Sequence, residues 1–443
     1  MAGAVQLKRN GLMPLARSGT TTHARKNLRF TEKNQLMNKQ RLLDRFLKYV
    51  QVDTTAVDEA GKYPSSDGQI ELGKVIVQQL KEMGVADVTQ DEHGIVMGTV
   101  PGNTEAPVVA FNAHFGTSPE TTGKNVKPNV IENFDGADIT LSGDPTKVIT
   151  AATCKELPDA KGKTIITTDG TTLLGGDDKC GVAIMMELAN HLIENPDIKR
   201  GDVRLLFTCD EEIGMGVSHV DVDSIKAAAC YTFDGGSEDI VDLETFSADG
   251  ATVTFTGVNI HPAIAKDKMI NAIRAAGHFL AGMPAELSPE RTEGREGFLH
   301  PYVLEGGVAK ATIKILLRDF DASKFDEYKK ILDDNGNRVE SEVDGIKVDI
   351  EYKKQYRNMA EGLGKEPRAV QYAVEAHERL GRAAKQQIIR GGTDGSRLTE
   401  LGLPTPNLSS GQHNIHSPLE WACLDEMVAA CEVGVEIVKR WAE

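Results

Sequence analysis

The sequence contains little of the material that would make a membrane, fibrous or disulfide-stapled protein. Aromatic residues make up only 5% of the 443 residues and hydrophobic residues 40%, as in ordinary globular proteins. No run of 18 or more apolar residues occurs, so we expect neither a transmembrane helix nor a membrane partner. The six cysteines are scattered and form no Cys-x-x-Cys pair, which argues against a disulfide framework and favours a reducing, cytoplasmic location.

Basic residues are outnumbered by acidic ones, 50 to 66. The formal net charge is -16, whereas binding to a polyanion needs a basic surface, so we expect no nucleic-acid partner. A chain of 443 residues is too long for one compact core, and two domains are the simplest expectation.

Residues 1–36 differ from the rest of the chain. They carry seven Lys and Arg residues against one acid and contain no apolar segment typical of a secretory signal. We expect a disordered leader or an upstream-start extension, with the folded protein beginning near Met37. An organellar transit segment is the alternative, because such segments are rich in Arg and poor in acids.

Helical and strand patterns alternate over the two ends of the chain. Apolar spacing predicts helices at 38–50, 66–83 and 180–192 and strands at 96–100, 108–112, 164–167, 202–208 and 227–233. From 367 onward it predicts a helix to 380, a strand at 387–389 and a helix at 424–441. This alternation predicts an α/β domain, a mixed sheet with helices on both faces, built from 37–245 and 357–443.

The middle of the chain has a different pattern. Strands are predicted at 252–256, 309–317 and 346–352, and helices at 269–280 and 320–332. These elements predict a two-layer α+β lid domain at 246–356, inserted into the catalytic domain.

Five short polar motifs follow or interrupt the apolar runs. They are 113–117 (AHFGT), 176–179 (GDDK), 210–212 (DEE), 233–236 (FDGG) and 413–416 (HNIH). Side chains that follow parallel strands meet at one edge of a sheet, where ligands bind. We therefore expect these motifs to converge.

The motifs supply the ligand types that zinc prefers, which are imidazole and carboxylate. His114 and His416 would be the terminal imidazoles, and the carboxylates would be Asp177, Glu212 and Asp234. Glu211, next to a ligand, would reach a water activated by two metal ions and accept its proton.

Each motif has an ordinary structural interpretation when it stands alone. The Asp-Glu-Glu triplet would be a solvated charge patch, Asp177-Asp178 a helix cap, and Asp234-Gly235-Gly236 a plain turn. His114 would be a structural histidine, and His413 and His416 would be solvated. The joint occurrence of all five favours the metal site.

With these motifs in place, the chain resembles the peptidase T branch of the dizinc metallopeptidases, the family that also contains aminoacylases and glutamate-type carboxypeptidases. The resemblance runs from about Met37 to the end. It rests on the stretches 123–138 (GKNVKPNVIENFDGAD), 174–181 (LGGDDKCG), 207–214 (FTCDEEIG), 231–236 (YTFDGG), 258–265 (VNIHPAIA), 292–300 (TEGREGFLH), 318–321 (RDFD), 390–395 (RGGTDG) and 403–408 (LPTPNL).

The resemblance implies two Zn²⁺ per subunit, with other divalent ions as alternatives. Asp177 would bridge the metals, His114 and Asp234 would complete one, and Glu212 and His416 the other. Glu211 would be the general base. A cis peptide would follow Asp177.

The resemblance also implies parts that handle the substrate. His261, in the lid, would stabilise the developing oxyanion. Arg318 and the residues Arg390, Gly391, Gly392 and Thr393 would hold the peptide. The implied partners are short peptides with a free N-terminus and a second copy of the chain, bound through the lid.

One position departs from the family's His-x-Asp motif, because Gly116 stands where the family has the aspartate that orients the ligand histidine. Loss of such an acid typically costs about 10–100-fold in metal affinity or activity. A water or a backbone carbonyl would then have to accept the imidazole N–H. A second departure is Ala263, where the family has glycine.

Three functions follow from this pattern. The first is a zinc aminopeptidase that releases the N-terminal residue of tripeptides by means of a metal-bridging water activated by Glu211. The second is a weakened or silent homologue that binds peptides or serves as a structural protein, which Gly116 favours. The third is a related dipeptidase or N-acyl amino acid hydrolase.

Overall fold

The computed structural model describes residues 37–443, so the predicted leader at 1–36 lies outside the described residues. Among the helices that the structure describes, none combines the length and the apolar character needed to cross a bilayer.

The larger sheet has eleven strands, and its four central strands run parallel. Along the main path the order is β1 (Ala86–Gln90), β2 (Val96–Val100), β8 (Val203–Thr208), β3 (Val109–His114), β9 (Ala229–Gly236), β16 (Asn407–His413), β17 (Trp421–Cys423), β7 (Ile165–Thr167) and β4 (Asn129–Ile131). Strands β10 (Ile240–Thr245) and β15 (Lys385–Ile389) pair beside β16. The parallel pairs β8–β3, β3–β9 and β9–β16 bring four carboxyl ends to one edge.

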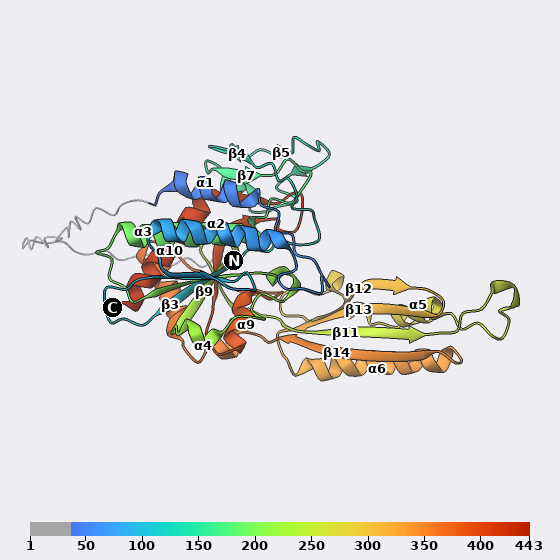
Figure 1. Ribbon diagram of the computed structural model, residues 1–443. Helices are drawn as coiled ribbons and strands as arrows, with labels where there is room; N and C mark the ends of the chain where they lie inside the picture. The colour runs from blue at the N-terminus through green and yellow to red at the C-terminus, as the bar shows by residue number, and fades with distance from the viewer. Residues whose placement is uncertain (1–36) are drawn as a thin grey trace, which may run out of the picture. The chain divides into compact units, whose positions relative to one another are not determined.

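Helices cover both faces of this sheet, as predicted (Figure 1). One face carries α1 (Lys39–Val50), α2 (Asp67–Met83), α3 (Gly176–Glu194), α8 (Arg368–Arg379) and α10 (Leu424–Trp441). The other carries α4 (Val222–Ile225) and α9 (Asp394–Glu400), while the short α7 (Ala360–Leu363) contacts α9 and β10. Alternate strand residues explain the two cores: Phe111 packs under the first set, and Ala110 under the second.

The predicted helix ends are confirmed where capping residues fix them. Asn38 accepts the backbone N–H of Arg41 at 3.0 Å, so α1 begins at Lys39. Gly84, in a left-handed conformation with φ of 84°, ends α2. Helix α3 starts earlier than predicted, at Gly176, and Asp177 and Asp178 at its start have non-helical backbone angles.

Two features of the strands could not be derived from local spacing. The consecutive strands β2 and β3 are not neighbours in the sheet, because β8 lies between them. Asp234 lies within β9 and does not follow it. Both features come from pairing between distant segments, which local apolar spacing does not encode.

A separate four-stranded antiparallel sheet forms the middle of the chain. Its order is β12 (Phe298–Gly306), β13 (Lys310–Asp319), β11 (Ser247–Thr256) and β14 (Lys347–Tyr356). Helices α5 (Ala272–Ala281) and α6 (Lys324–Glu342) share a hydrophobic cluster with it. The two-layer α+β arrangement is as predicted, although β12 was missed; the boundaries at 246 and 356 stay a prediction.

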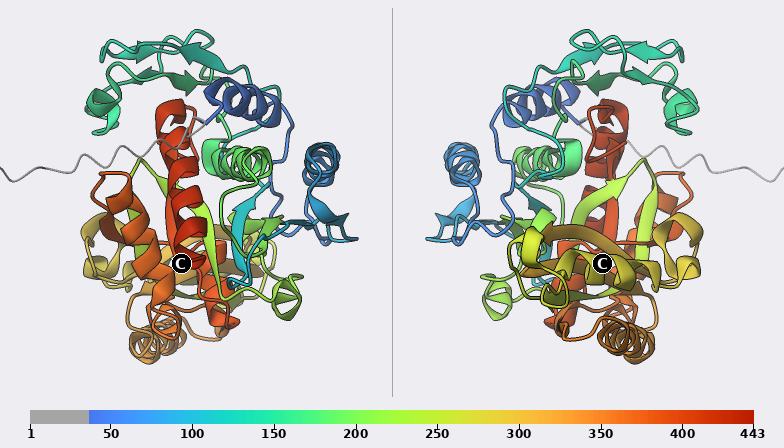
Figure 2. Two further views of the ribbon diagram at one scale, coloured as in Figure 1. Left: turned by 90° about the vertical axis from the view of Figure 1, so that its left-hand side faces the viewer. Right: turned by 90° about the vertical axis from the view of Figure 1, so that its right-hand side faces the viewer.

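A third, smaller hydrophobic cluster joins the connection between β3 and α3 to the larger sheet. This connection contains β4, β5 (Ile139–Thr140), β6 (Val148–Ile149) and β7, and its buried residues pack with Trp421 and Cys423. Both views in Figure 2 show this teal segment on the side of α1 and α10. Its strands β7 and β4 extend the larger sheet beyond β17.

Candidate metal centre and active site

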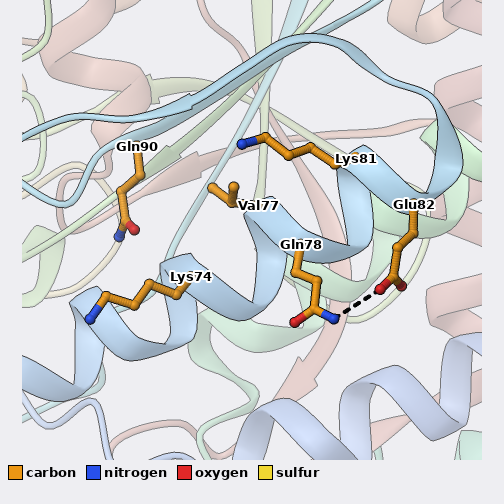
Figure 3. A pocket seen from close by; sticks show the side chains of 6 residues that line it. All are labelled: Lys74, Val77, Gln78, Lys81, Glu82 and Gln90. Carbon is orange, nitrogen blue, oxygen red and sulfur yellow. Dashed lines mark hydrogen bonds between the residues drawn. The ribbon is translucent and has the colours of Figure 1, made fainter.

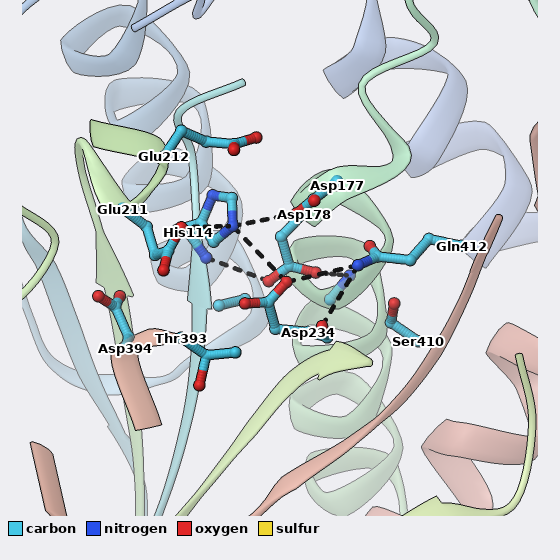
Figure 4. Close-up of polar contacts among 12 residues, drawn as sticks. His114, Asp177, Asp178, Glu211, Glu212, Asp234, Thr393, Asp394, Ser410 and Gln412 are labelled. Carbon is cyan, nitrogen blue, oxygen red and sulfur yellow. Dashed lines mark hydrogen bonds and ion pairs between the residues drawn. The ribbon is translucent and has the colours of Figure 1, made fainter. Parts of the chain in front are cut away.

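The five polar motifs meet at the carboxyl edge of the parallel strands. His114 is the last residue of β3, Glu211 and Glu212 follow β8, and Asp234 lies near the end of β9. His416 comes three residues after the end of β16. The predicted convergence is therefore observed, and Figure 4 displays most of these side chains.

His114 and two carboxylates form one half of the cluster. His114 Nε2 lies 3.2 Å from Asp177 Oδ1 and 3.6 Å from Asp234 Oδ1. Asp234 is held from β16: Asn407 accepts its backbone N–H at 3.1 Å, and the Gln412 amide lies 3.4 Å from its carboxylate. These three predicted ligands are thus brought together from the ends of two strands and the start of α3.

His416 and two carboxylates form the other half. His416 Nε2 lies 2.8 Å from Glu212 Oε2 and 3.3 Å from Asp177 Oδ2. Asp177 therefore faces a different histidine with each of its two oxygens. This is the arrangement that a bridging carboxylate between two cations requires.

Glu211 lies at the edge of the cluster, with Oε2 3.9 Å from His114 Nε2. Beside it, buried Asp394 of α9 is bonded to the Thr208 hydroxyl. Burial raises the pKa of Glu211 well above its usual range; the charges of Asp234 and Asp394 add to the rise, and His114 opposes it. The sequence interpretation had not singled out Asp394.

The same excess of acid perturbs the predicted ligands. Burial raises the pKa of Glu212 and of Asp234 to about 7 each, and the charge of Asp177 adds to both. Burial opposes protonation of His416, but its bonds to Asp177 and Glu212 raise its pKa to about 11. Burial would likewise raise the pKa of Asp177, but the two histidines hold it well below its usual range.

These residues fit a pair of cations. His114 Nε2, Asp177 Oδ1 and Glu212 Oε1 are buried and have no hydrogen-bond partner within residues 37–443. Their ligand atoms lie within 4.8 Å of one another, as do those of His114, Asp178 and Asp234. Divalent cations would satisfy these atoms and supply the positive charge that the acidic cluster lacks.

The second ring nitrogen of His114 has a partner despite the missing aspartate. His114 Nδ1 lies 2.9 Å from the backbone carbonyl of Gly116, which can only accept, so Nδ1–H is the donor. The His114 backbone N–H donates to Asp178 Oδ2 at 3.2 Å. Asp178 follows Asp177 through a cis peptide, as the family resemblance implied.

A buried network that the sequence interpretation missed holds the Glu211-Glu212 turn. The carboxylate of Asp210 accepts from the backbone N–H of Ser65 at 2.6 Å, from its hydroxyl, and from Gln69 Nε2 at 2.6 Å. The Gln69 carbonyl accepts the Asp210 backbone N–H at 2.8 Å. The start of α2 thereby fixes the turn that carries both glutamates.

Not every predicted residue joins the cluster. His261 is exposed, and its Nδ1 accepts the backbone N–H of Ala263 at 3.2 Å. Among the described residues, no hydrogen bond or ion pair connects it to the cluster, so its catalytic role stays a prediction.

The residues predicted to hold the peptide lie where the two sheets approach. Arg318 donates to the carbonyls of Asp249 and Leu317, and its guanidinium lies 5.7 Å from the centre of the Tyr356 ring. The Tyr356 ring occupies the space in which a side chain at Gly392 would stand. Tyr356 was missed from the sequence, although it contacts two predicted positions.

Arg390 binds the neighbouring loop at 292–296. It donates to the carbonyls of Gly294 and Glu296 at 2.9 and 2.8 Å and to the Thr292 hydroxyl at 2.9 Å. Thr393 caps α9 by accepting from Gly395 at 3.1 Å, with half-buried Gly391 before it. The two stretches 292–300 and 390–395 are therefore bonded to each other.

His413 has a structural role. It is buried, stacks on Trp421 at 3.8 Å and bonds Glu426 through Nε2 at 2.7 Å. Together with Cys154 and Glu156 it forms a separate group of nearby ligand atoms.

A surface hollow on α2 and β1 has none of this chemistry. It is lined by Lys74, Val77, Gln78, Lys81, Glu82 and Gln90, and Figure 3 shows one bond between two of these side chains. None of its residues belongs to the motif cluster.

The comparisons agree with the geometry. The model of "Peptidase family M20/M25/M40" matches residues 168–440. Peptidase T of Bacillus cereus (strain B4264) is 45% identical over 407 residues, which cover 91% of this chain and 99% of that protein.

Two solved structures share the fold. Aminopeptidase PepT from Bacillus cereus ATCC 10987 has a TM-score of 0.69 at 24% identity, covering 92% of this chain and 100% of that one. A tripeptidase from Staphylococcus aureus has a TM-score of 0.72 at 22% identity, covering 92% and 99%. The chain therefore belongs to peptidase family M20/M25/M40 and is an enzyme that hydrolyses peptides.

Proposed function

We propose that this enzyme is a dizinc aminopeptidase that releases the N-terminal residue of tripeptides. The observation that carries the proposal is the bridging position of Asp177, whose two oxygens lie 3.2 and 3.3 Å from the nitrogens of two different histidines. His114, Asp177 and Asp234 would hold one zinc, and Asp177, Glu212 and His416 the other. Members of the family generally bind two metal ions.

Two zinc ions held there would polarise the scissile carbonyl and activate a water for attack. Glu211 is suited to take the proton from the attacking water, because it lies beside the ligands, with Oε2 3.9 Å from His114 Nε2. Its raised pKa in the protein alone reflects the surrounding acids, and bound cations would lower it. The same carboxyl can then return the proton to the leaving amine.

The choice of tripeptides rests on the relatives and on the peptide-handling positions. The curated relatives are peptidases T, and one solved neighbour is a tripeptidase. Arg318 would recognise the substrate carboxylate, with Gly391, Gly392 and Thr393 lining the peptide backbone. Arg390 would hold the loop at 292–296 that borders them.

Two other functions are less well supported by the contacts in the site. A weakened or silent homologue was suggested by Gly116, but His114 Nδ1 already has an acceptor at 2.9 Å, which removes the main reason for it. A dipeptidase or N-acyl amino acid hydrolase would use the same metals. The bonded pair of stretches 292–300 and 390–395, which resemble the peptidase T branch, favours the tripeptidase.

The proposal also includes a lid function for 246–356, a dimer of the chain and a cytoplasmic location. We infer that 246–356 acts as a lid and as the surface for a second copy, because it has its own sheet and core. All six cysteines are unpaired and buried, which supports a reducing, cytoplasmic location.

A substrate panel tests the proposal. The purified enzyme with zinc is given a tripeptide, its N-acetylated form, the matching dipeptide and an N-acyl amino acid, and products are identified by mass spectrometry. The proposal expects only the free tripeptide to lose its N-terminal residue at a high rate. Preference for the N-acyl or dipeptide substrate would replace it with the third function, and no turnover would favour the second.

A further inference from the structure

Glu420 is a buried carboxylate that the catalytic proposal does not use. It lies in the loop between β16 and β17, and it is only 1% exposed. A carboxylate is costly to bury unless its oxygens are hydrogen-bonded, so its partners indicate its role.

Those partners are the backbone N–H groups of the segment that carries Asp177. Glu420 Oε2 accepts from Leu174 at 2.7 Å and from Gly175 at 2.8 Å, while Oε1 accepts from Asp177 at 3.1 Å. Gly175 has φ of 79°, a left-handed conformation that suits glycine. One side chain thus fixes three backbone donors around the turn that leads to the bridging carboxylate.

The loop that carries Glu420 also carries His416. Within it the Ser417 hydroxyl donates to the Asn414 carbonyl at 2.8 Å, and the Glu420 backbone N–H donates to the Ser417 carbonyl at 3.2 Å. The backbone of His416 has φ of 61°, a left-handed conformation that is uncommon for residues other than glycine. The internal bonds therefore tie His416 to Glu420, and Glu420 ties both to Asp177.

A buried lysine follows the same segment of chain. Lys179, on the first turns of α3, is 2% exposed, and its ammonium donates to the carbonyl of Val52 at 2.9 Å. Burial lowers the pKa of Lys179 to about 8, and the charge of Glu420 opposes this shift. An added side chain at Gly176 would stand 3.1 Å from Glu420 Oε1, so the turn packs closely on the carboxylate.

We propose that Glu420 is a positioning residue that holds the bridging Asp177 in register with His416, and so sets the affinity of the site for its second metal ion. The inference rests on the proposed dizinc function. Glu420 touches neither metal nor substrate in this account; it acts through the backbone of 174–177.

Glu420→Gln is the informative variant, because it keeps the shape and removes one acceptor. The Gln side chain has only one oxygen that can accept hydrogen bonds. Its NH₂ group would face a backbone N–H, so two donors would face each other. The matched control is Glu426→Gln, since Glu426 is a buried carboxylate nearby in sequence that bonds His413 and Lys163 and none of the predicted ligands.

Zinc affinity is measured for the full chain by competition with a chelating dye. We expect Glu420→Gln to bind the weaker of its two zinc ions about 10–100-fold less tightly, while Glu426→Gln binds like the wild type. An affinity for Glu420→Gln equal to that of the wild type would overturn the inference. An equal loss in both variants would also overturn it, because it would indicate general destabilisation.

Amide hydrogen exchange of the metal-free chain provides a second measurement that does not depend on zinc or turnover. We expect the peptide containing Leu174, Gly175 and Asp177 to exchange faster in Glu420→Gln than in the wild type or in Glu426→Gln. If the wild type bound no zinc, the proposed function would fail. The exchange rate of this peptide alone would then test the positioning role of Glu420. Unchanged exchange would then overturn the positioning role, and faster exchange would uphold it.

Discussion

The imidazole of His114 donates to the backbone carbonyl of Gly116, with Nδ1 2.9 Å from the oxygen. This bond fixes the tautomer that leaves Nε2 free to face Asp177 and Asp234. The family uses an aspartate side chain for this purpose, and here the main chain of the same residue supplies the acceptor. A carbonyl is neutral, so it orients the ring without adding the negative charge that strengthens a histidine ligand.

Gly116 variants separate orientation from charge. An added Cβ would lie 3.0 Å from Gln69 Oε1 and 3.3 Å from the Asp210 backbone nitrogen, so any side chain must displace Gln69 slightly. Gly116→Ala imposes this crowding alone, and Gly116→Asp adds the carboxylate. We expect Gly116→Asp to bind zinc up to about 10-fold more tightly than Gly116→Ala, or to turn over faster. Zinc titration and hydrolysis of a tripeptide check this, and an aspartate variant no better than the alanine variant would contradict it.

Replacement of Glu211 separates chemistry from metal binding. Glu211→Gln is expected to lower kcat by about 10²–10⁴-fold, because the amide cannot accept a proton, while zinc content stays at the wild-type level. The neighbouring Glu212→Gln is the matched control and should lose zinc instead, since Glu212 Oε2 lies 2.8 Å from His416. Zinc content and turnover of both purified variants check this prediction. Loss of zinc from Glu211→Gln would show that Glu211 is a metal ligand and not the general base.

Metal binding should depend on pH with a definite sign. In the protein alone the bonds to Asp177 and Glu212 raise the pKa of His416 to about 11, and burial raises the pKa of Glu212 and Asp234 to about 7. Below these values the groups carry protons that a cation must displace, so zinc affinity falls as pH falls. We therefore expect zinc binding to release protons at neutral pH, with His416 as the main source. Calorimetry in two buffers of different ionisation enthalpy measures the number, and a value of zero would contradict the ligand set.

Two adjacent glycines test the contact between Tyr356 and the 390–395 loop. A Cβ at Gly392 would lie 2.3 Å from Tyr356 Cζ, whereas a Cβ at Gly391 would have its nearest neighbour at 3.8 Å, in ordinary contact. Gly392→Ala should therefore lower stability by about 1–3 kcal/mol and raise KM, since Tyr356 is displaced beside Arg318. Gly391→Ala should leave stability unchanged, because its Cβ would be in ordinary van der Waals contact. Thermal unfolding and tripeptide kinetics of the pair check this; equal behaviour would show that the ring moves freely.

Local pattern was enough to predict most of the elements and the convergence of the motifs. The period of apolar residues placed α1, α2 and α10 closely, because each buries one face on the sheet. The strand ends placed His114 and Glu212 at one edge, because β3 and β8 run parallel. What the pattern could not give was the pairing order, since β8 and β3 are nearly a hundred residues apart.

The supporting residues were harder to predict because they act across long distances in sequence. Glu420 bonds a segment about 245 residues away, and Gln69 bonds Asp210 across 141 residues. Glutamate is almost never fully buried unless it is paired, so the sequence around Glu420 gave no reason to expect its burial. Nothing in the sequence indicated that the carbonyl of Gly116 would serve His114, because a backbone acceptor leaves no side-chain signature.

Zinc content and tripeptide hydrolysis, measured on one preparation of the wild-type chain, test the central claim most directly. The account predicts two zinc ions per chain, release of the N-terminal residue, loss of turnover on chelation and recovery when zinc is restored. Undiminished hydrolysis by the metal-free chain, or no hydrolysis with two zinc ions bound, would contradict it.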